Sequence, residues 1–501
     1  MAITNGALLN SVPASMQQTL STNYIDFNQD MGWAQQYLPD LMEKEAEVFG
    51  PRTISGFLSQ VGAEESMTAD QVIWSEQGRL HLSYKGNVAS TNAGADTGAG
   101  GTTPRITIES DIDETAGFTA ANHGIRVNDT IIVSNSDGIF KCLVTVVNGA
   151  NIDVAPYGAT TLAANTTSNG TTILVYGSEF GKGDSYRAAT GTTNTTDSRG
   201  ANEPTFTTFS NKPIIMKDYY EVSGSDTARI GWVEVASEEG QSGYLWYLKA
   251  EADTRARFTD YIEMAMLEGE LNVAGSVADG ATILPGSTAG AGNVGTEGLF
   301  AAIESRGNIT TGVTGVSASV DLAEFDAILA EFDKQGAIEE NMLFVNRSTS
   351  LAIDDMLASM NSYGSGGTSY GVFDNEEDMA LNLGFSGFRR GSYDFYKSDF
   401  RYLNDLATRG GINAANSANA IRGVIIPAGT STVYDQMLGK NLKRPFLHVR
   451  YRASQTDNRK MKTWTTGSVG AATSALDAMQ IHMLTERCLV TQGANNFMLM
   501  K

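Results

Sequence analysis

The run GAGNVG contains the residues whose spacing comes closest to that of a chemical motif. Gly290, Gly292 and Gly295 match the glycine spacing of a dinucleotide-binding loop, in which small residues let the backbone approach a pyrophosphate. In that motif a strand leads directly into the loop, and an acidic residue ends the next strand. Neither feature is present in the sequence around this run. We therefore interpret the run as a Gly-rich connection and expect no bound cofactor.

The histidines and the acidic residues also do not match the spacing of a known metal site. The chain has four histidines, and no two of them are spaced as metal ligands are. They are His81, His123, His448 and His482. Asp111, Asp113 and Glu114 form an acidic cluster, but the calcium-loop spacing fails at the next ligand position. We interpret this cluster as a solvated turn and expect no metal site.

Familiar catalytic motifs are absent from the sequence. No P-loop, zinc-protease, nucleophile-elbow or C-x-x-C pattern occurs. Carboxylate pairs are common in so acidic a chain, so none stands out as an acid/base couple. The sequence gives no positive evidence for an enzyme, and we assign no catalytic, cofactor-binding or metal-binding residue.

Composition narrows the class of protein further. The 501 residues suffice for about three domains, and the net charge of −22 argues against broad affinity for nucleic acid or anionic membranes. Cys142 and Cys488 are the only cysteines, so no disulfide framework is expected. The first basic residue is Lys44, and no apolar run approaches the length of a membrane span. We expect synthesis in a cytoplasm, without a signal peptide.

The sequence predicts a single long helix over 241–270 that should position many of the other elements of the fold. The run lacks proline, and at 1.5 Å per residue the helix would be about 40 Å long. Its apolar residues recur at steps of three and four, which places them on one face. They are Tyr244, Leu245, Leu248, Ala252, Phe258, Ile262 and Met266. One long helix among short strands and loops is typical of a scaffold rather than of a catalytic pocket.

Strand patterns precede this helix. The region 105–180 is rich in β-branched residues, and Asp137-Gly138 predicts a hairpin within it. Small polar linkers at 89–104 and 181–204 bracket that region. This arrangement indicates a small β-domain inserted into a long loop.

The flanks of this loop and the second half of the chain complete the pattern. The strand–turn–strand pattern at 71–85 could pair with the strand pattern at 205–222 and close the loop. A mixed α/β region follows the long helix, with helices expected at 321–335 and 348–360. Further strands are expected at 342–346, 388–400, 421–429 and 443–490.

This order of elements resembles the major capsid proteins of tailed bacteriophages with the Hong Kong 97-like fold, an α+β class. In that family an N-terminal arm leads into an extended loop, a spine helix and sheet form a peripheral domain, and the chain returns from an axial domain. Four segments carry the resemblance and are most similar to capsid proteins of crAss-like and related marine phages. They are residues 204–232, 242–270, 342–360 and 378–405.

The resemblance implies a division of the chain into arm, loop, insert and two domains. In chain order these are an N-terminal arm at 1–66, an extended loop at 67–104 and 181–222, an inserted β-domain at 105–180, a peripheral domain at 223–298 and 441–501 with its spine helix at 241–270, and an axial domain at 299–440.

The resemblance also implies a function. Such a chain assembles with itself into the hexamers and pentamers of an icosahedral head that encloses double-stranded DNA. Its partners would be a portal protein, a separate scaffolding protein and head decoration proteins, and it would reside in the virion without contacting a membrane. Two alternatives stay open: an encapsulin-type nanocompartment shell protein, and an α/β nucleotide-binding enzyme that uses 290–295.

Two expectations concern processing of the chain in this family. Some members join the extended loop to a neighbouring subunit through a Lys–Asn isopeptide bond, but here an insert occupies the loop and we assign no such pair. Some members carry a helical scaffolding segment that a protease removes. Only about 66 residues precede the loop here and no heptad pattern occurs in them, so we expect no such cleavage.

The two ends of the chain differ in charge. Residues 1–66 contain eight acidic and two basic residues, a net charge of −6, whereas 443–501 contain three acidic and nine basic residues, a net charge of +6. We expect Glu43, Glu45 and Glu47 to lie near basic residues of the C-terminal strands. The basic candidates are Arg450, Arg452, Lys460 and Lys462. The alternative is that these basic side chains face packaged DNA.

Overall fold

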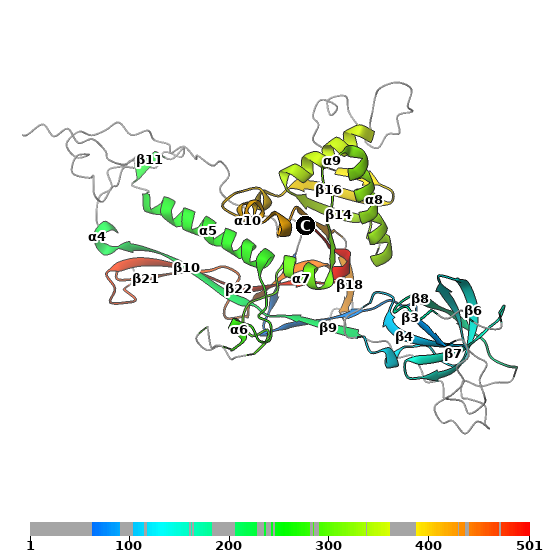
Figure 1. Ribbon diagram of the computed structural model, residues 1–501. Coiled ribbons are helices and arrows are strands. Elements are labelled where there is room, and N and C mark those ends of the chain that lie inside the picture. Colours follow the sequence, from blue (N-terminus) through cyan, green and yellow to red (C-terminus); the bar gives the residue numbers. More distant parts are fainter. Residues whose placement is uncertain are drawn as a thin grey trace, which may run out of the picture. The chain divides into compact units, whose positions relative to one another are not determined.

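The fold is known from a computed structural model that describes most of the chain from residue 63 onward (Figure 1). The described residues are 63–90, 104–114, 118–159, 162, 165–182, 206–227, 235–236, 242–243, 246–280, 284, 290–336, 338–360, 387–428, 430–435, 440–469 and 472–501. The chain divides into a first unit, Met1–Val72 with Asn211–Lys501, and a second unit, Ile73–Ser210. Most of the expected N-terminal arm and of both linkers lies outside the described residues.

The second unit contains a closed antiparallel barrel of six strands. Their order around the barrel is β3-β4-β7-β6-β5-β8. The strands are β3 (Ser83–Ser90), β4 (Arg105–Asp111), β5 (Asp129–Asn135), β6 (Gly138–Asn148), β7 (Asn151–Pro156) and β8 (Thr171–Ser178). Closure leaves no strand of the barrel with an unpaired edge.

Alternating side chains fill the barrel. Ile106 and Ile108 of β4 and Ile131 and Val133 of β5 point inward and are buried, as the two-residue period of a strand requires. The hairpin expected at Asp137-Gly138 is present, because Asn135 pairs with Gly138 across a two-residue turn.

The barrel draws one strand from outside the region 105–180. β3 pairs with β4 on one side and with β8 on the other, so it is the strand that closes the barrel. The sequence placed its residues in the extended loop, because a long polar linker separates β3 from β4. Two strands beyond the barrel, β2 (Val72–Gln77) and β9 (Phe206–Asn211), pair with each other.

The first unit contains a five-stranded sheet built from distant parts of the chain. Its order is β1-β20-β22-β10, and β21 also pairs with β22. The strands are β1 (Ala63–Met67), β10 (Ile214–Ser223), β20 (Leu447–Arg452), β21 (Lys462–Gly467) and β22 (Ala478–Thr491).

The long helix α5 (Trp246–Glu268) lies along β10 and β22 of this sheet (Figure 1). Phe258 and Ile262 pack with Met483 of β22, and Met266 is also buried, as the spacing predicted. Ala252 is exposed instead. The helix begins five residues later than the sequence suggested, and the residues at 244–245 lie outside the described part.

A second sheet of the first unit has six strands in the order β13-β23-β17-β14-β16-β15. They are β13 (Asn308–Thr310), β14 (Glu340–Val345), β15 (Gly387–Arg390), β16 (Tyr393–Asp399), β17 (Gly423–Pro427) and β23 (Met498–Met500). Helices α8 (Ala318–Gln335) and α9 (Arg347–Met360) cover one face, and α7 (Leu299–Arg306) covers the other. Because both faces are covered, Leu343 and Phe344 are both buried although they point to opposite sides.

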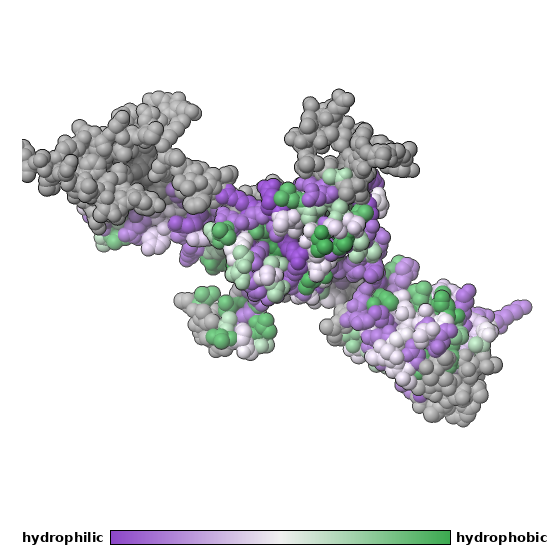
Figure 2. All heavy atoms as spheres, turned by 45° about the horizontal axis from the view of Figure 1, so that its top comes forward, coloured by the Kyte–Doolittle hydropathy of each residue, from purple (hydrophilic) through white to green (hydrophobic). Residues whose placement is uncertain are grey.

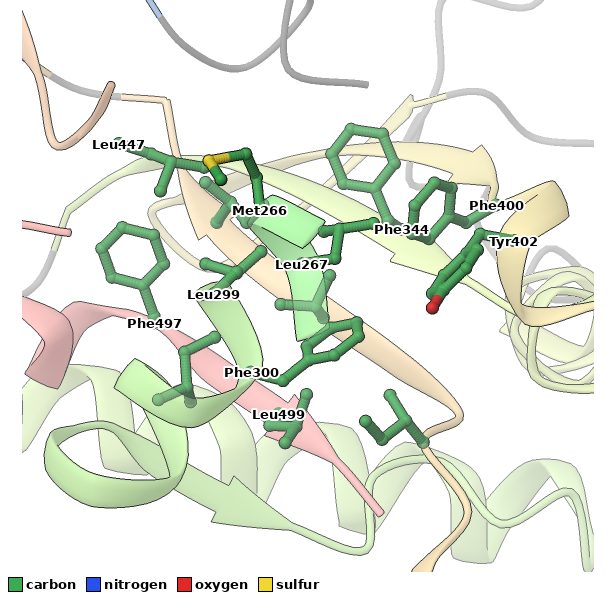
Figure 3. Packing of buried hydrophobic residues seen from close by; sticks show 14 of the residues in the cluster. Met266, Leu267, Leu299, Phe300, Phe344, Phe400, Tyr402, Leu447, Phe497 and Leu499 are labelled. Carbon is green, nitrogen blue, oxygen red and sulfur yellow. The ribbon is translucent and has the colours of Figure 1, made fainter. Parts of the chain in front are cut away.

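One hydrophobic cluster joins the end of α5 to the six-stranded sheet. Met266 and Leu267 of α5 pack with Phe300 of α7, Phe344 of β14 and Leu499 of β23 (Figure 3). The C-terminal strand β23 therefore belongs to the six-stranded sheet, between β13 and β17. The remaining short elements are α4 (Gly224–Thr227), β11 (Val235–Ala236), β12 (Ser242–Gly243), α6 (Val277–Gly280), α10 (Arg409–Ala415), β18 (Thr430–Asp435) and β19 (Lys440–Pro445).

Candidate functional site

Among the described residues, a group of interacting charges lies where β1 meets the C-terminal strands. β1 pairs in parallel with β20, from Ala63 opposite His448 to Met67 opposite Arg452. Its sequence, AEESM, contributes no side chain to any hydrophobic cluster of the described residues. Backbone pairing and charged side chains must therefore hold β1 in place.

Two glutamates of β1 reach basic side chains of the C-terminal strands. The Glu64 carboxylate contacts Lys460 and lies 3.4 Å from Nη1 of Arg487. Glu65 accepts from Nη2 of Arg450 at 2.7 Å. Alternate residues of a strand point to opposite sides. These two carboxylates therefore bind β1 to the C-terminal strands on both faces of the sheet.

A second group of charges lies just beyond β1. Arg452 contacts Asp70 and donates from Nε to Oε1 of Glu486 at 2.7 Å. Arg459 donates to the other oxygen of Glu486 at 2.5 Å. The Glu486 side chain is only 6% exposed, so its charge depends on these two guanidinium groups.

The environment shifts the titration of this cluster. Burial lowers the pKa of Arg487, and the negative charges of Glu64 and Glu263 partly offset that effect. The hydrogen bond to Asp70 raises the pKa of Arg452. Both groups remain cationic near neutral pH, so the cluster can hold an acidic strand but offers no group poised for proton transfer.

Among the described residues, acidic side chains close to the C-terminal strands pair with the expected basic residues. Arg450, Arg452 and Lys460 are paired with Glu65, Asp70 and Glu64 respectively. Lys462 pairs instead with the nearby Asp457. The three glutamates at 43, 45 and 47 lie outside the described residues.

Glu486 was not singled out from the sequence, although apolar residues flank it on both sides in the β22 run MLTERCLV. A charge inside such a run signals a buried acid that needs cationic partners.

The backbone conformation of the GAGNVG loop itself requires these glycines. Gly290, Gly292 and Gly295 all have positive φ values, and a Cβ on Gly295 would lie 2.0 Å from the carbonyl oxygen of Glu270. Asn272 bonds this loop at both ends, donating to the Gly290 carbonyl and accepting from the Val294 amide at 3.0 Å each. These contacts explain the glycines without a nucleotide.

The acidic cluster of the second unit forms ion pairs. Arg79 donates two hydrogen bonds to Asp113, and Lys85 lies 2.5 Å from Glu114. The described residues contain no group of three His, Cys, Asp or Glu side chains that could hold a metal ion. Asp113 and Glu114 thus each have a basic side chain as partner.

The four histidines lie in different surroundings. His448 is buried in β20 and His482 lies on β22, whereas the His123 ring meets Tyr84 edge to face in the second unit and His81 is exposed.

Each unit buries one cysteine. Burial raises the pKa of Cys142, in the barrel, and of Cys488, on β22, to about 12. A thiol with so high a pKa is protonated near neutral pH and is a poor nucleophile. Neither cysteine is therefore a candidate for covalent catalysis.

The visible surface is mixed in character. On the face shown in Figure 2, hydrophilic and hydrophobic residues alternate over the described part without one large hydrophobic area. Among the described helices, none is both long enough and apolar enough to cross a membrane.

Comparisons with solved structures find phage particles. A structure from Mycobacterium phage Ogopogo aligns over 93% of this chain and 97% of its own, with 10% identity and a TM-score of 0.37. A capsid structure of the cyanophage P-SCSP1u aligns over 97% of this chain and 98% of its own, with 7% identity and a TM-score of 0.37. One from Microbacterium phage Oxtober96 covers 95% and 99%, with 10% identity and a TM-score of 0.35.

No protein-family model matches the chain. No curated protein matches it either. We therefore base the function proposed next on the elements described above and on the sequence segments that they contain.

Proposed function

We propose that this chain is the major capsid protein of a tailed bacteriophage and assembles into an icosahedral shell. The observation that carries the proposal is the layout of the first unit. A 23-residue helix lies along a sheet whose strands come from both ends of the chain, and a closed barrel is inserted between β2 and β9. This layout supports the Hong Kong 97-like fold that the sequence resemblance implied.

The chemistry of the described residues suits a structural role. The cysteines are buried, the histidines are dispersed, the glycine loop is internally bonded, and the charged cluster fastens strands together. Side chains arranged in this way stabilise a scaffold.

The proposed assembly consists of hexamers and pentamers of this chain around double-stranded DNA. A portal protein, a separate scaffolding protein and head decoration proteins would complete the head, and the chain would be made in the host cytoplasm. Basic strands that face packaged DNA are the alternative for the C-terminal charges. The ion pairs of Arg450, Arg452 and Lys460 within the chain favour a role in holding β1 instead.

Negative-stain electron microscopy of the expressed protein, alone and together with its genomic neighbours, tests this proposal. We expect closed shells of uniform size, or shells that appear when a scaffolding protein is supplied. Shells that enclose an enzyme cargo rather than DNA would favour the encapsulin-type alternative. A soluble monomer that binds a nicotinamide cofactor would contradict the shell function and favour the enzyme.

A further inference from the structure

β10 is a long, regular strand at one border of the five-stranded sheet. It pairs with β22 through ten consecutive residues without a bulge, and no other described strand pairs with it. Proteins usually protect such edges with prolines, bulges or short length, because an unprotected edge is a template for another strand. β10 has none of these three protections.

The outer edge of β10 has backbone positions around Tyr219 that do not pair with β22. Its N–H donates to the side chain of the adjacent Asp218 at 2.9 Å rather than to β22. In an antiparallel ladder, every second residue turns its N–H and C=O groups away from a given neighbour. Tyr219 and the residues two positions away, Lys217 and Glu221, therefore present their backbone groups to an incoming strand.

The face of the sheet that lies away from α5 carries a row of rings leading to this edge. Trp464, His482 and Tyr219 lie in register across β21, β22 and β10. Adjacent ring centroids are 5.2 and 6.0 Å apart, and both pairs are stacked. Met216 and Met483 pack toward α5, which places the row on the opposite face. Tyr219, the last ring, is 56% exposed.

The charges of β10 are complementary to those of a second β10. When two such strands run antiparallel with Tyr219 opposite Tyr219, Lys217 of each copy lies opposite Glu221 of the other. Opposite charges across an antiparallel pair attract, and like charges in that position repel. Registers centred on Lys217, Asp218 or Glu221 instead place a charge opposite its own copy. The register centred on Tyr219 is thus selected by charge.

We propose that β10 binds β10 of a second copy of this chain, antiparallel and across a twofold axis at Tyr219. The contact joins two five-stranded sheets edge to edge and continues the row of rings from one copy into the next. Such an interface is isologous, since the same patch is used on both copies. Its place in a shell rests on the proposed function, whereas the strand pairing itself depends only on β10.

Disulfide formation between copies tests both the contact and its register. Opposite residues of an antiparallel pair have Cα atoms about 4.5–5.5 Å apart, which is within disulfide range. The full-length Tyr219→Cys variant should form a cross-linked dimer under mild oxidation. In the matched Lys217→Cys variant the two thiols would be four residues apart along the strands, roughly 13 Å, and should not cross-link. The double variant Lys217→Cys, Glu221→Cys should cross-link again.

Charge exchange provides a test that introduces no thiol. Lys217→Glu and Glu221→Lys should each weaken association of the copies about tenfold, because each puts like charges at both outer pairs. The double exchange restores both pairs and should restore association. Lys462→Glu, which changes a charge on β21 away from the edge, serves as the control and should leave association unchanged.

Electron microscopy of the same samples separates this contact from the shell function. Shells that form while Tyr219→Cys stays uncross-linked, or cross-links no better than Lys217→Cys, would overturn the contact and leave the shell in place. Cross-linked dimers with the expected register and no shells would support the contact and overturn the shell. A double exchange that does not restore association would also count against the contact.

Discussion

The two units of this protein are stabilised in different ways. The barrel of the second unit is closed, and its interior is a continuous cluster of branched apolar side chains such as Ile131 and Ile152. The five-stranded sheet of the first unit is open, and its border strand β1 is held by ion pairs rather than by apolar burial. A closed barrel pairs every one of its strands on both sides, whereas the open sheet has border strands that no other described strand covers.

The largest effect should appear when the barrel loses β3, the strand that closes it. We predict that residues 79–182 fold alone, whereas 105–182 do not, because without β3 the edges of β4 and β8 are unpaired and the core is open. Amide spectra of the two fragments check this prediction. A dispersed spectrum for the shorter fragment would show that β3 is dispensable and would restore the boundary at 105.

The next largest effect concerns the buried acid of the open sheet. Glu486→Gln removes the charge that Arg452 and Arg459 share, and both arginines are only partly exposed. We expect the free energy of unfolding to fall by about 2–3 kcal/mol, measured by denaturant titration.

The exposed pair of Asp457 with Lys462 provides the matched control. Asp457→Asn should leave the unfolding midpoint unchanged. Equal effects of the two substitutions would mean that burial of Glu486 contributes nothing to the free energy of unfolding.

A smaller effect should follow from pH and be shared by both units. Burial raises the pKa of Cys142 and Cys488 to about 12, above the ordinary value of 9.0. The unfolded chain then loses thiol protons first as the pH rises, so stability is complete below pH 9 and falls from there toward pH 12. Between pH 8 and pH 10 the free energy of unfolding should fall by roughly 1 kcal/mol for each cysteine. Comparing each Cys→Ala variant with the parent chain isolates this loss, which should vanish in the variant.

The smallest effect is a salt-dependent loss of stability at β1 in the first unit. Glu64→Gln and Glu65→Gln should each destabilise β1 by about 0.2–1 kcal/mol at low ionic strength. The difference from the parent chain should shrink at 1 M salt, where exposed charges are screened. Hydrogen exchange of the β1 and β20 amides measures the effect. Unchanged exchange at either salt concentration would mean that backbone pairing alone holds β1.

The sequence predicted local patterns well. The period of α5 correctly placed Phe258 and Ile262 in the core, and Asp137-Gly138 correctly placed a hairpin, because both depend on neighbours close in sequence. These signals need no knowledge of the partner strand or helix.

Long-range partners could not be read from such patterns. β3 joins the barrel across a polar linker, and β23 joins the six-stranded sheet from the end of the chain. The net charges of the two ends predicted that they attract, but not that Glu64 and Glu65 are the acidic partners. Charge totals over a segment do not fix the register of a strand, which depends on backbone pairing.

The contrast between the units can be tested most directly by thiol labelling, since each unit has one buried cysteine. Cys488 lies on β22 opposite Arg450 of β20, and Cys142 lies inside the barrel. With the other cysteine replaced by alanine, we predict that raising salt from 0.05 to 1 M increases the labelling rate of Cys488 several-fold and leaves that of Cys142 unchanged. Equal responses of the two thiols to salt would contradict the view that charges hold the open sheet and apolar packing holds the barrel.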